Sequence, residues 1–371
     1  MVVEPDIPQR IARFTPLDDV LVRLDAMTKP APPRASELAA ALGRTLAADV
    51  VAAAAIPAAA HALRDGWAVA SDLTVDAGTY APAPLPSALR VDAGGLLPPG
   101  ADAVAPLDAV TIRDGVPQAV APVTCGEGVL AAGGDAGAGA LLMPAGRRLE
   151  RLHIALLAAA GITAVHVRAP RLRLVRARPG NDAMIDAAVA CVATAAAGMG
   201  GDVVTGEELT DALADAAADA VVVLGGTGSG GNDATVRTLA SAGEVHAHGI
   251  ALLPGETTAL GIAGGRPVLA LPGRLDAALA AWHMLGQVML ARLAGSLEPL
   301  HLRTAKLTHK IASVVGFSEL VPVRCEGFSA TPIGSGYVPL SGLARANGWV
   351  FIAPDSEGYP EETQVVIRPW P

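Results

Sequence analysis

Apolar residues follow two different periods along this chain. Over residues 17–27 they recur every three or four positions, which is typical of an amphipathic helix, and a Pro-rich break separates this helix from a second one predicted over 36–43. Residues 51–147 instead hold short apolar runs broken by Pro, Gly and Asp, which predicts small β-structure with many turns. A helix is predicted over 148–160, with Gly161 just beyond its end.

From residue 171 onward, short apolar runs alternate with longer Ala-rich stretches. This alternation predicts strands joined by helices, and therefore a parallel, doubly wound sheet with a ligand site beyond the strand ends. The predicted strands are 171–177, 202–204, 220–224, 246–252 and 267–271. The predicted helices are 183–197, 207–218, one that opens at Asn232 and Asp233, and 276–293.

The end of the chain returns to β-structure, because residues 306–315, 319–325, 349–354 and 363–370 read as four strands joined by polar turns. The fold class is therefore multidomain α/β and β. The predicted domains are a helical N-terminal linking domain (1–50 and 146–168), a β-rich insertion domain (51–145), a central α/β domain (169–299) and a small C-terminal β-domain (300–371).

Composition restricts the classes of partner. The chain has 371 residues, 51% of them hydrophobic, and its net charge of −9 argues against nucleic acid and anionic membrane surfaces. Cys125, Cys191 and Cys325 are widely separated and form neither a disulfide framework nor a metal-binding spacing. Neither a signal-peptide pattern nor an apolar run long enough to span a bilayer is visible. The predicted location is the cytoplasm.

Positive charge is distributed unevenly by residue type. Lysine occurs only at Lys29, Lys306 and Lys310, so the chain from 30 to 305 carries its positive charge on Arg. An anion bound there must be held by Arg, by backbone N–H groups or by hydroxyl groups. The planar guanidinium suits oxyanions, whereas an ammonium group is a point charge.

The most informative segment is VVVLGGTGSGGNDAT, residues 221–235. A buried-strand pattern there meets a turn with five glycines, whose exposed N–H groups ahead of a helix predict an anion site. The segment is neither a Walker A loop, since no Gly-Lys-Ser/Thr follows, nor a dinucleotide fingerprint, since no acidic ribose partner follows. A glycine-rich turn without a ligand is the alternative interpretation.

Several segments in the same order resemble the molybdopterin molybdenumtransferase family, the MoeA type that also forms the E domain of gephyrin. DGWAV is similar to the family's DGYAV, and AGGDAGAGALLMPAGRRL to its GED segment. The further similar segments are FTPLDDVLVRL, ALGRTLAADVVA, LGGTGSGGNDATV, LLPGETTALGIAGGRPVLALPG, KIASVVGFSELVPV and LSGLARANGWVFIAPDSEG. The resemblance extends over nearly the whole chain.

The resemblance implies a fold, a reaction and partners. The expected protein is an elongated cytoplasmic homodimer whose central domain binds molybdopterin. The expected reaction inserts molybdate into adenylylated molybdopterin and releases AMP, with Mg²⁺ at the diphosphate. Beyond the pterin ligand, the expected partners are a molybdopterin adenylyltransferase or a molybdoenzyme, with neither nucleic acid nor membrane.

The resemblance also assigns residues. Four acidic residues match catalytic positions, and three of them are the expected Mg²⁺ ligands: Asp135, Asp186 and Asp233, with Asp65 as the fourth catalytic residue. The expected cofactor-binding residues are Gly225, Gly226, Thr227, Gly228, Ser229, Pro272, Gly273 and Arg274. An alternative is that Asp186 and Asp233 cap helices while Asp65 and Asp135 end turns.

The chain departs from the family pattern at the expected molybdate pocket. Leu253 and Glu256 stand where the family has lysines, so two cations are replaced by an apolar residue and an acid. One hypothesis is that Arg274, with Arg176 and Arg178 at the end of a strand, supplies the missing charge. The alternative is that Arg274 pairs with Glu256 or Asp276.

The changed pocket leaves three functions open. The first is a working insertase; the second is an impaired molybdopterin- or cofactor-binding protein that acts as a carrier, chaperone or regulator. A dimeric scaffold is a third. Weaker site candidates are a metal set at Glu244, His246 and His248, and His61 beside Asp65.

Overall fold

The computed structural model describes residues 9–178, 180, 182–206, 208–297 and 302–370. The chain forms two compact units: a larger unit of Met1–Ala48, Ala145–Ile154 and Thr163–Pro371, and a smaller unit of Asp49–Pro144 and Ala155–Ile162. Within the described part of the chain, every helix is too short or too polar to cross a membrane.

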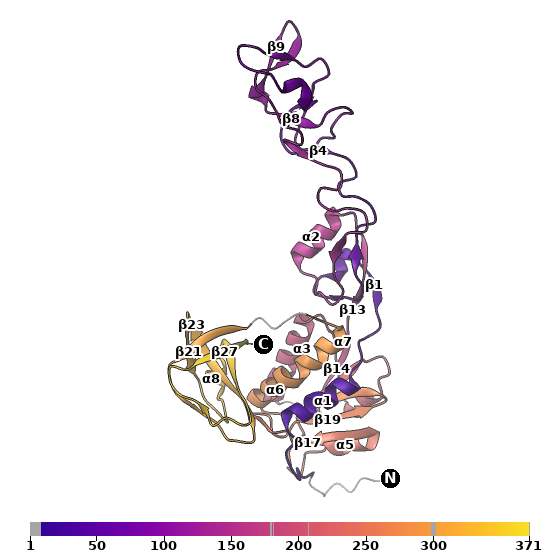
Figure 1. Ribbon diagram of the computed structural model, residues 1–371. Helices are drawn as coiled ribbons and strands as arrows, with labels where there is room; N and C mark the ends of the chain where they lie inside the picture. Colours follow the sequence, from indigo (N-terminus) through magenta and orange to yellow (C-terminus); the bar gives the residue numbers. More distant parts are fainter. Residues whose placement is uncertain (1–8, 179, 181, 207, 298–301, 371) are drawn as a thin grey trace. The chain divides into compact units, whose positions relative to one another are not determined.

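A six-stranded sheet lies at the centre of the larger unit (Figure 1). Its order is β15-β14-β16-β20-β19-β17, and the first four strands are parallel. The strands are β14 (Arg171–Arg176), β15 (Asp202–Gly206), β16 (Ala220–Leu224), β17 (Gly243–His248), β19 (Ala259–Ala263) and β20 (Arg266–Leu271). The predicted doubly wound α/β domain is confirmed, but the sheet is mixed rather than parallel, because β19 runs antiparallel to both of its neighbours.

The sheet is covered on both faces, as the alternation of its side chains requires. Val222 and Leu224 of β16 enter one apolar cluster, whereas Val221 and Val223 enter the other. The first cluster includes residues of α1, α3, α6 and α7, and the second includes residues of α4 and α5. The helices are α1 (Leu17–Met27), α3 (Ala183–Gly198), α4 (Leu209–Ala214), α5 (Thr235–Ala242), α6 (Leu275–Ala281) and α7 (Gln287–Ala294).

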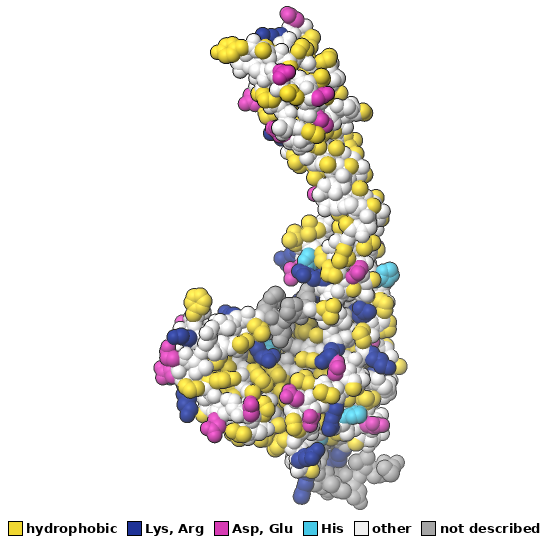
Figure 2. Space-filling model, viewed as in Figure 1, with side chains coloured by type: hydrophobic (Ala, Val, Ile, Leu, Met, Phe, Trp, Pro, Cys, Tyr) yellow, Lys and Arg dark blue, Asp and Glu magenta, His cyan; other side chains and the backbone are white. Residues whose placement is uncertain are grey.

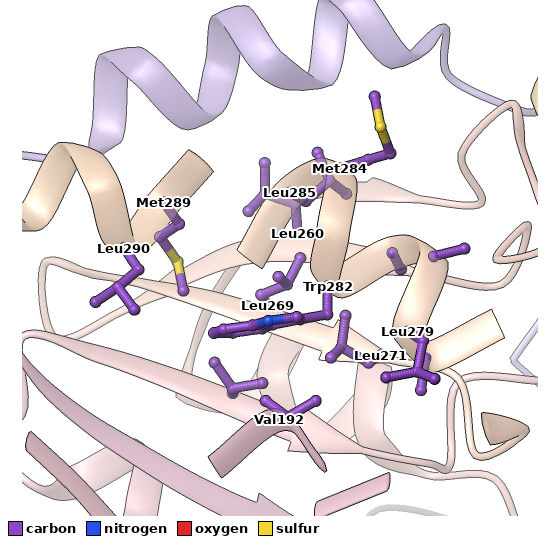
Figure 3. Packing of buried hydrophobic residues seen from close by; sticks show 14 of the residues in the cluster. Val192, Leu260, Leu269, Leu271, Leu279, Trp282, Met284, Leu285, Met289 and Leu290 are labelled. Atoms are coloured by element: carbon purple, nitrogen blue, oxygen red, sulfur yellow. The ribbon is translucent and has the colours of Figure 1, made fainter. Parts of the chain in front are cut away.

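One π-helical turn, Trp282–Gly286, joins α6 and α7, so the predicted helix over 276–293 is nearly continuous. Figure 3 shows the Trp282 indole ring lying against Leu269 and Leu271 of the sheet. A Cβ atom at Gly286 would overlap that ring, so the packing of Trp282 requires glycine there. Trp282 is fully buried.

Three predicted helices differ from the structure. Residues 36–43 form the end of β1 (Arg34–Glu37) and a 3₁₀ turn, because β1 pairs with the distant strand β13 (Ala164–Arg168). The helix predicted over 207–218 is only Leu209–Ala214, and its first position lies outside the described residues. The helix expected to open at Asn232 begins at Thr235, because Asp233 is held in the preceding loop.

The linking elements of the larger unit form a small antiparallel sheet of β1, β13 and β2 (Thr45–Leu46), next in sequence to α2 (Arg151–Ala159). Gly161 follows α2 with a φ of +76°, as predicted.

The C-terminal β-domain is a closed barrel. Its strands pair in the circular order β23-β24-β21-β27-β25, and β25 returns to pair with β23. The barrel strands are β21 (Arg303–Leu307), β23 (Ser318–Glu326), β24 (Ser329–Pro332), β25 (Gly348–Ile352) and β27 (Gln364–Pro369). The short strand β18 (Leu252–Leu253) adds to β23 from the α/β domain. Further elements are β22 (Ile311–Ala312), β26 (Gly358–Tyr359) and α8 (Leu340–Leu343).

The smaller unit consists of short antiparallel strands, as its turn-rich sequence predicts. Its core gathers Val69, Leu85, Val110 and Val123. The strands are β3 (Val50–Val51), β4 (His61–Ala62), β5 (Gly66–Val69), β6 (Ala83–Pro84), β7 (Leu89–Val91), β8 (Ala103–Ala105), β9 (Val110–Arg113), β10 (Val116–Ala119), β11 (Val129–Leu130) and β12 (Leu141–Met143).

Charge is mixed on the surface of the larger unit. On the face seen in Figure 2, side chains of Lys and Arg lie among those of Asp and Glu. This unit therefore presents both signs on one face.

A buried histidine makes the stability of the larger unit depend on pH. His283 is 4% exposed, its Nδ1 has no partner among the described residues, and its ring lies 6.2 Å from that of Trp349. Burial lowers the pKa of His283 to about 4, and the charge of Arg368 acts in the same direction. Between the unfolded value of 6.5 and about 4, the unfolded chain therefore binds the extra proton.

Stability is accordingly expected to fall as pH drops from 6.5 to about 4, by on the order of 3 kcal/mol for this one group. His283→Phe should flatten this part of the curve of urea unfolding free energy against pH, while the exposed His309→Gln should leave it unchanged. An identical slope in His283→Phe would contradict the assignment.

Candidate functional site

A pocket of 340 Å³ lies at the carboxyl ends of β16 and β20. Doubly wound sheets bind ligands at this edge. Its lining combines the glycine loop after β16 with the turn after β20 and with residues of the segment between β18 and β19. The lining residues are Arg178, Ile185, Gly225, Gly226, Thr227, Gly228, Asp233, Glu256, Thr257, Pro272, Gly273, Arg274 and Ala277. The structure therefore brings together most of the predicted cofactor-binding residues.

The glycine loop adopts a conformation that other residues resist. Gly225 and Gly226 have φ values of +90° and +67°. A Cβ atom at Gly226 would clash with Oγ1 of Thr235 and lie 2.9 Å from Cβ of Ala177. The loop is fixed to the sheet because the N–H of Gly225 donates to the carbonyl of Leu271 at 2.9 Å.

The same loop presents unpaired donors. Among the described residues, no group accepts a hydrogen bond from the N–H groups of Gly226, Thr227, Gly228 or Ser229. Successive free N–H groups in a glycine-rich turn form a concave anion site. The loop is therefore chemically suited to a phosphate group.

Asp233 closes the loop. Its Oδ2 accepts from the N–H of Gly230 at 2.9 Å, and its side chain lines the pocket. It does not cap α5, whose N-cap residue is Ala234. The cap of α3 is Asp182 and not Asp186, because Oδ1 of Asp182 accepts from two N–H groups of the first turn. Asp186 instead forms an ion pair with Arg176.

Arg274 is held by an acid, as the pairing alternative predicts. Its Nε and Nη2 donate to the two carboxylate oxygens of Asp276 at 2.9 and 3.1 Å, and Asp276 is 2% exposed. The guanidinium also lies 5.3 Å from the ring centre of Tyr337. Although desolvation opposes it, the hydrogen bonds and charge of Asp276 raise the pKa of Arg274. Arg274 therefore lines the pocket, but the carboxylate of Asp276 partly neutralises its positive charge.

Residues 256 and 257, in the segment that lacks the family's lysines, carry an acid and a hydroxyl group. Oε2 of Glu256 accepts from the N–H of Gly255 at 3.0 Å. Oγ1 of Thr257 lies 3.0 Å from Oγ1 of Thr227 across the pocket. The lining thus holds two Arg and two acidic side chains, so its charges offset one another.

Comparisons with known proteins agree with this arrangement. Three family profiles match in chain order: the MoeA N-terminal region (domain I and II) over residues 15–161, the probable molybdopterin binding domain over 201–292, and the MoeA C-terminal region (domain IV) over 304–370. This chain belongs to the MoeA family. The resemblance seen in the sequence is confirmed.

Individual MoeA relatives match over almost their full length. Molybdopterin molybdenumtransferase 2 of Mycobacterium tuberculosis is 27% identical over 387 aligned positions, which cover 89% of this chain and 93% of the relative. A crystal structure of the molybdopterin biosynthesis MoeA protein from Pyrococcus horikoshii is 28% identical, with a TM-score of 0.81, and covers 97% of this chain and 100% of that one. Another crystal structure, of a molybdopterin biosynthesis MoeA protein from Pyrococcus horikoshii OT3, is 22% identical with a TM-score of 0.78, covers 96% of this chain and 100% of that one, and has the same fold.

The remaining predicted MoeA site residues lie in the smaller unit. Oδ1 of Asp65 accepts from the N–H of Ala93 at 2.8 Å, and Asp135 is exposed. Nδ1 of His61 lies 2.8 Å from the carbonyl oxygen of Gly94. Their part in the site stays a prediction.

The candidate metal set on β17 does not form. A β-bulge at His246 interrupts the alternation, and His248 turns to the glycine loop, where its Nε2 lies 2.9 Å from the carbonyl oxygen of Thr227. The described residues hold no group of three or more metal-ligating side chains. His248 thus contacts the glycine loop beside the pocket, a role different from the metal ligand that the sequence suggested.

A larger cavity of 880 Å³ lies at the amino ends of β16 and β20. Much of its lining is Ala and Pro. The guanidinium of Arg266, which also lines it, is engaged, because its Nη2 donates to the carbonyl of Leu213 at 2.6 Å. The glycine loop whose N–H groups have no partner among the described residues lies at the opposite edge of the sheet. Chemistry therefore favours the smaller pocket as the functional site.

Proposed function

We propose that this MoeA-family chain inserts molybdate into adenylylated molybdopterin and releases AMP. The observation that supports this most strongly is the pocket at the carboxyl edge of the sheet, where the glycine loop offers unpaired N–H groups. A pterin ligand of this kind carries phosphate, and backbone N–H groups bind phosphate without a lysine.

Different residues of the pocket are proposed to contact different groups of the ligand. Gly226, Thr227, Gly228 and Ser229 cradle the phosphate. Arg178 lines the pocket and, in the described part of the chain, pairs with no carboxylate, so it is the cation proposed to attract the oxyanions. Arg274 is proposed to orient the ligand rather than to neutralise it, because Asp276 holds its guanidinium.

Mg²⁺ is proposed to accompany the diphosphate. Asp233 is the carboxylate that lines the pocket, and Mg²⁺ commonly uses one or two protein carboxylates together with phosphate oxygens. The bound ion would supply charge neutralisation at the diphosphate. Asp135 and Asp186 are further proposed ligands, and Asp65 is a proposed catalytic residue. Asp186 would have to leave its pair with Arg176 to serve.

The setting of the reaction is proposed as well. A homodimer in the cytoplasm would receive the adenylylated pterin from an adenylyltransferase and pass the finished cofactor to a molybdoenzyme.

A single-turnover reaction tests this function. The protein is mixed with adenylylated molybdopterin and Mg²⁺, with and without molybdate, and AMP is followed. Molybdate-dependent AMP release is expected in the wild type and a loss of tenfold or more in Arg178→Ala, since one charge pair is worth about 1–4 kcal/mol. Arg237→Ala, outside the pocket lining, is the control. Tight pterin binding without AMP release would overturn the insertase and favour the carrier.

A further inference from the structure

The glycine loop is held by a side chain more than 200 positions away in sequence. Gln9 is 7% exposed, and its Nε2 donates to the carbonyl oxygens of Gly226 at 2.6 Å and Gly228 at 2.8 Å. Its Oε1 accepts from the N–H of Val236 at 3.2 Å. One buried amide group thus binds the loop at two points and the following helix at a third.

The two carbonyl contacts fix which way the loop's donors point. In a trans peptide the C=O and the next residue's N–H point in opposite directions. Holding the carbonyls of Gly226 and Gly228 toward Gln9 therefore turns the N–H groups of Thr227 and Ser229 away from it. These are two of the donors without a partner among the described residues.

The third contact substitutes for a missing helix cap. The N-cap residue of α5 is Ala234, which has no side-chain acceptor, so the first-turn N–H groups need another partner. Oε1 of Gln9 accepts from one of them, that of Val236. The start of α5 and the loop before it are thereby tied to the same side chain.

The segment that carries Gln9 is itself anchored. The N–H of Thr15 donates to the carbonyl of Gly249 at 2.9 Å, and the N–H of Ala251 donates to the carbonyl of Thr15 at 2.8 Å. Ile11 packs so closely on Gly249 that a Cβ atom there would overlap it. The segment that carries Gln9 is therefore held against residues 249–251 at Ile11 and Thr15.

We propose that Gln9 is a positioning residue that presets the glycine loop for phosphate. It contacts the loop through backbone carbonyls and is absent from the pocket lining, so it acts on the ligand through the loop. The identity of the ligand rests on the proposed function, whereas the presetting of the loop does not.

Two substitutions separate its contacts. Gln9→Met keeps the length and loses every polar contact. Gln9→Glu keeps the acceptor for Val236, but its carboxylate cannot donate to the two carbonyls. Gln364→Met, at an exposed position in the C-terminal barrel, is the matched control.

The first readout is hydrogen exchange of the ligand-free protein, which needs no assumption about the ligand. Both variants are expected to speed exchange in peptides that cover 225–236 while peptides of the barrel keep their wild-type rates. Faster exchange throughout the larger unit, or no change in 225–236, would overturn the positioning role.

The second readout is the Kd for molybdopterin. Losing two hydrogen bonds that orient the cradle is expected to weaken binding about tenfold in both variants. Wild-type affinity in Gln9→Glu would overturn the role of the carbonyl contacts. If exchange changes as expected but the wild type does not bind molybdopterin, the positioning role stands and the proposed function fails.

Discussion

Gly226→Ala is expected to weaken molybdopterin binding about a hundredfold. The residue has a φ of +67°, which alanine adopts with strain, and its added Cβ would clash with Oγ1 of Thr235. Strain of this kind and overpacking cost about 1–3 kcal/mol each, and a shift of the loop that relieves them would displace its unpaired N–H groups. Isothermal titration with molybdopterin would measure the loss.

The same loop provides a matched control. Gly231 has no positive φ, and a Cβ added there would meet nothing within 4 Å. Gly231→Ala should therefore bind molybdopterin with nearly wild-type affinity. Equal losses in the two variants would mean that the cradle does not depend on the conformation at Gly226.

Asp276→Ala is expected to destabilise the larger unit by about 2–4 kcal/mol, because two backbone N–H groups lose their acceptor and the half-exposed Arg274 loses its partner. The carboxylate is 2% exposed and accepts four hydrogen bonds: two from Arg274, and one each from the N–H groups of Ala277 and Val338 at 2.9 Å. Because Val338 precedes α8 in the C-terminal part of the chain, the loss should also loosen the contact between the α/β domain and the barrel.

Urea unfolding followed by tryptophan fluorescence would measure this loss. Glu326→Ala is the comparison, because its pair with Arg324 is exposed and such pairs contribute about 1 kcal/mol or less. A stability loss for Asp276→Ala as small as that of Glu326→Ala would contradict the buried role of Asp276.

The local pattern of the sequence was enough to predict elements that depend on nearby residues. The opening helix agrees with α1, where every third or fourth residue is buried, and the apolar run after residue 219 agrees with β16, where every residue is buried. The helix predicted over 36–43 is wrong because β1 is stabilised by pairing with β13, about 130 positions later in the chain. Likewise, nothing within β19 indicates that it runs antiparallel between β20 and β17.

In the site, too, residues that are close in sequence could be predicted and residues from distant segments could not. The glycine loop and the pair formed by Arg274 and Asp276 are local in sequence, so both could be proposed from spacing. Gln9 and His248 reach the loop from other segments; Gln9 belongs to no recognisable motif, and the pattern around His248 predicts a metal ligand instead. The expected roles of Asp65 and Asp135 rest on the resemblance alone, because their local contacts in the smaller unit do not indicate a ligand.

A crystal structure of the protein with bound molybdopterin would decide whether the glycine loop is the phosphate cradle. We expect the terminal phosphate within hydrogen-bonding distance of the N–H groups of Thr227, Gly228 and Ser229, with the pterin in the 340 Å³ pocket. A phosphate bound instead in the 880 Å³ cavity beside Lys29 and Arg266 would contradict this assignment.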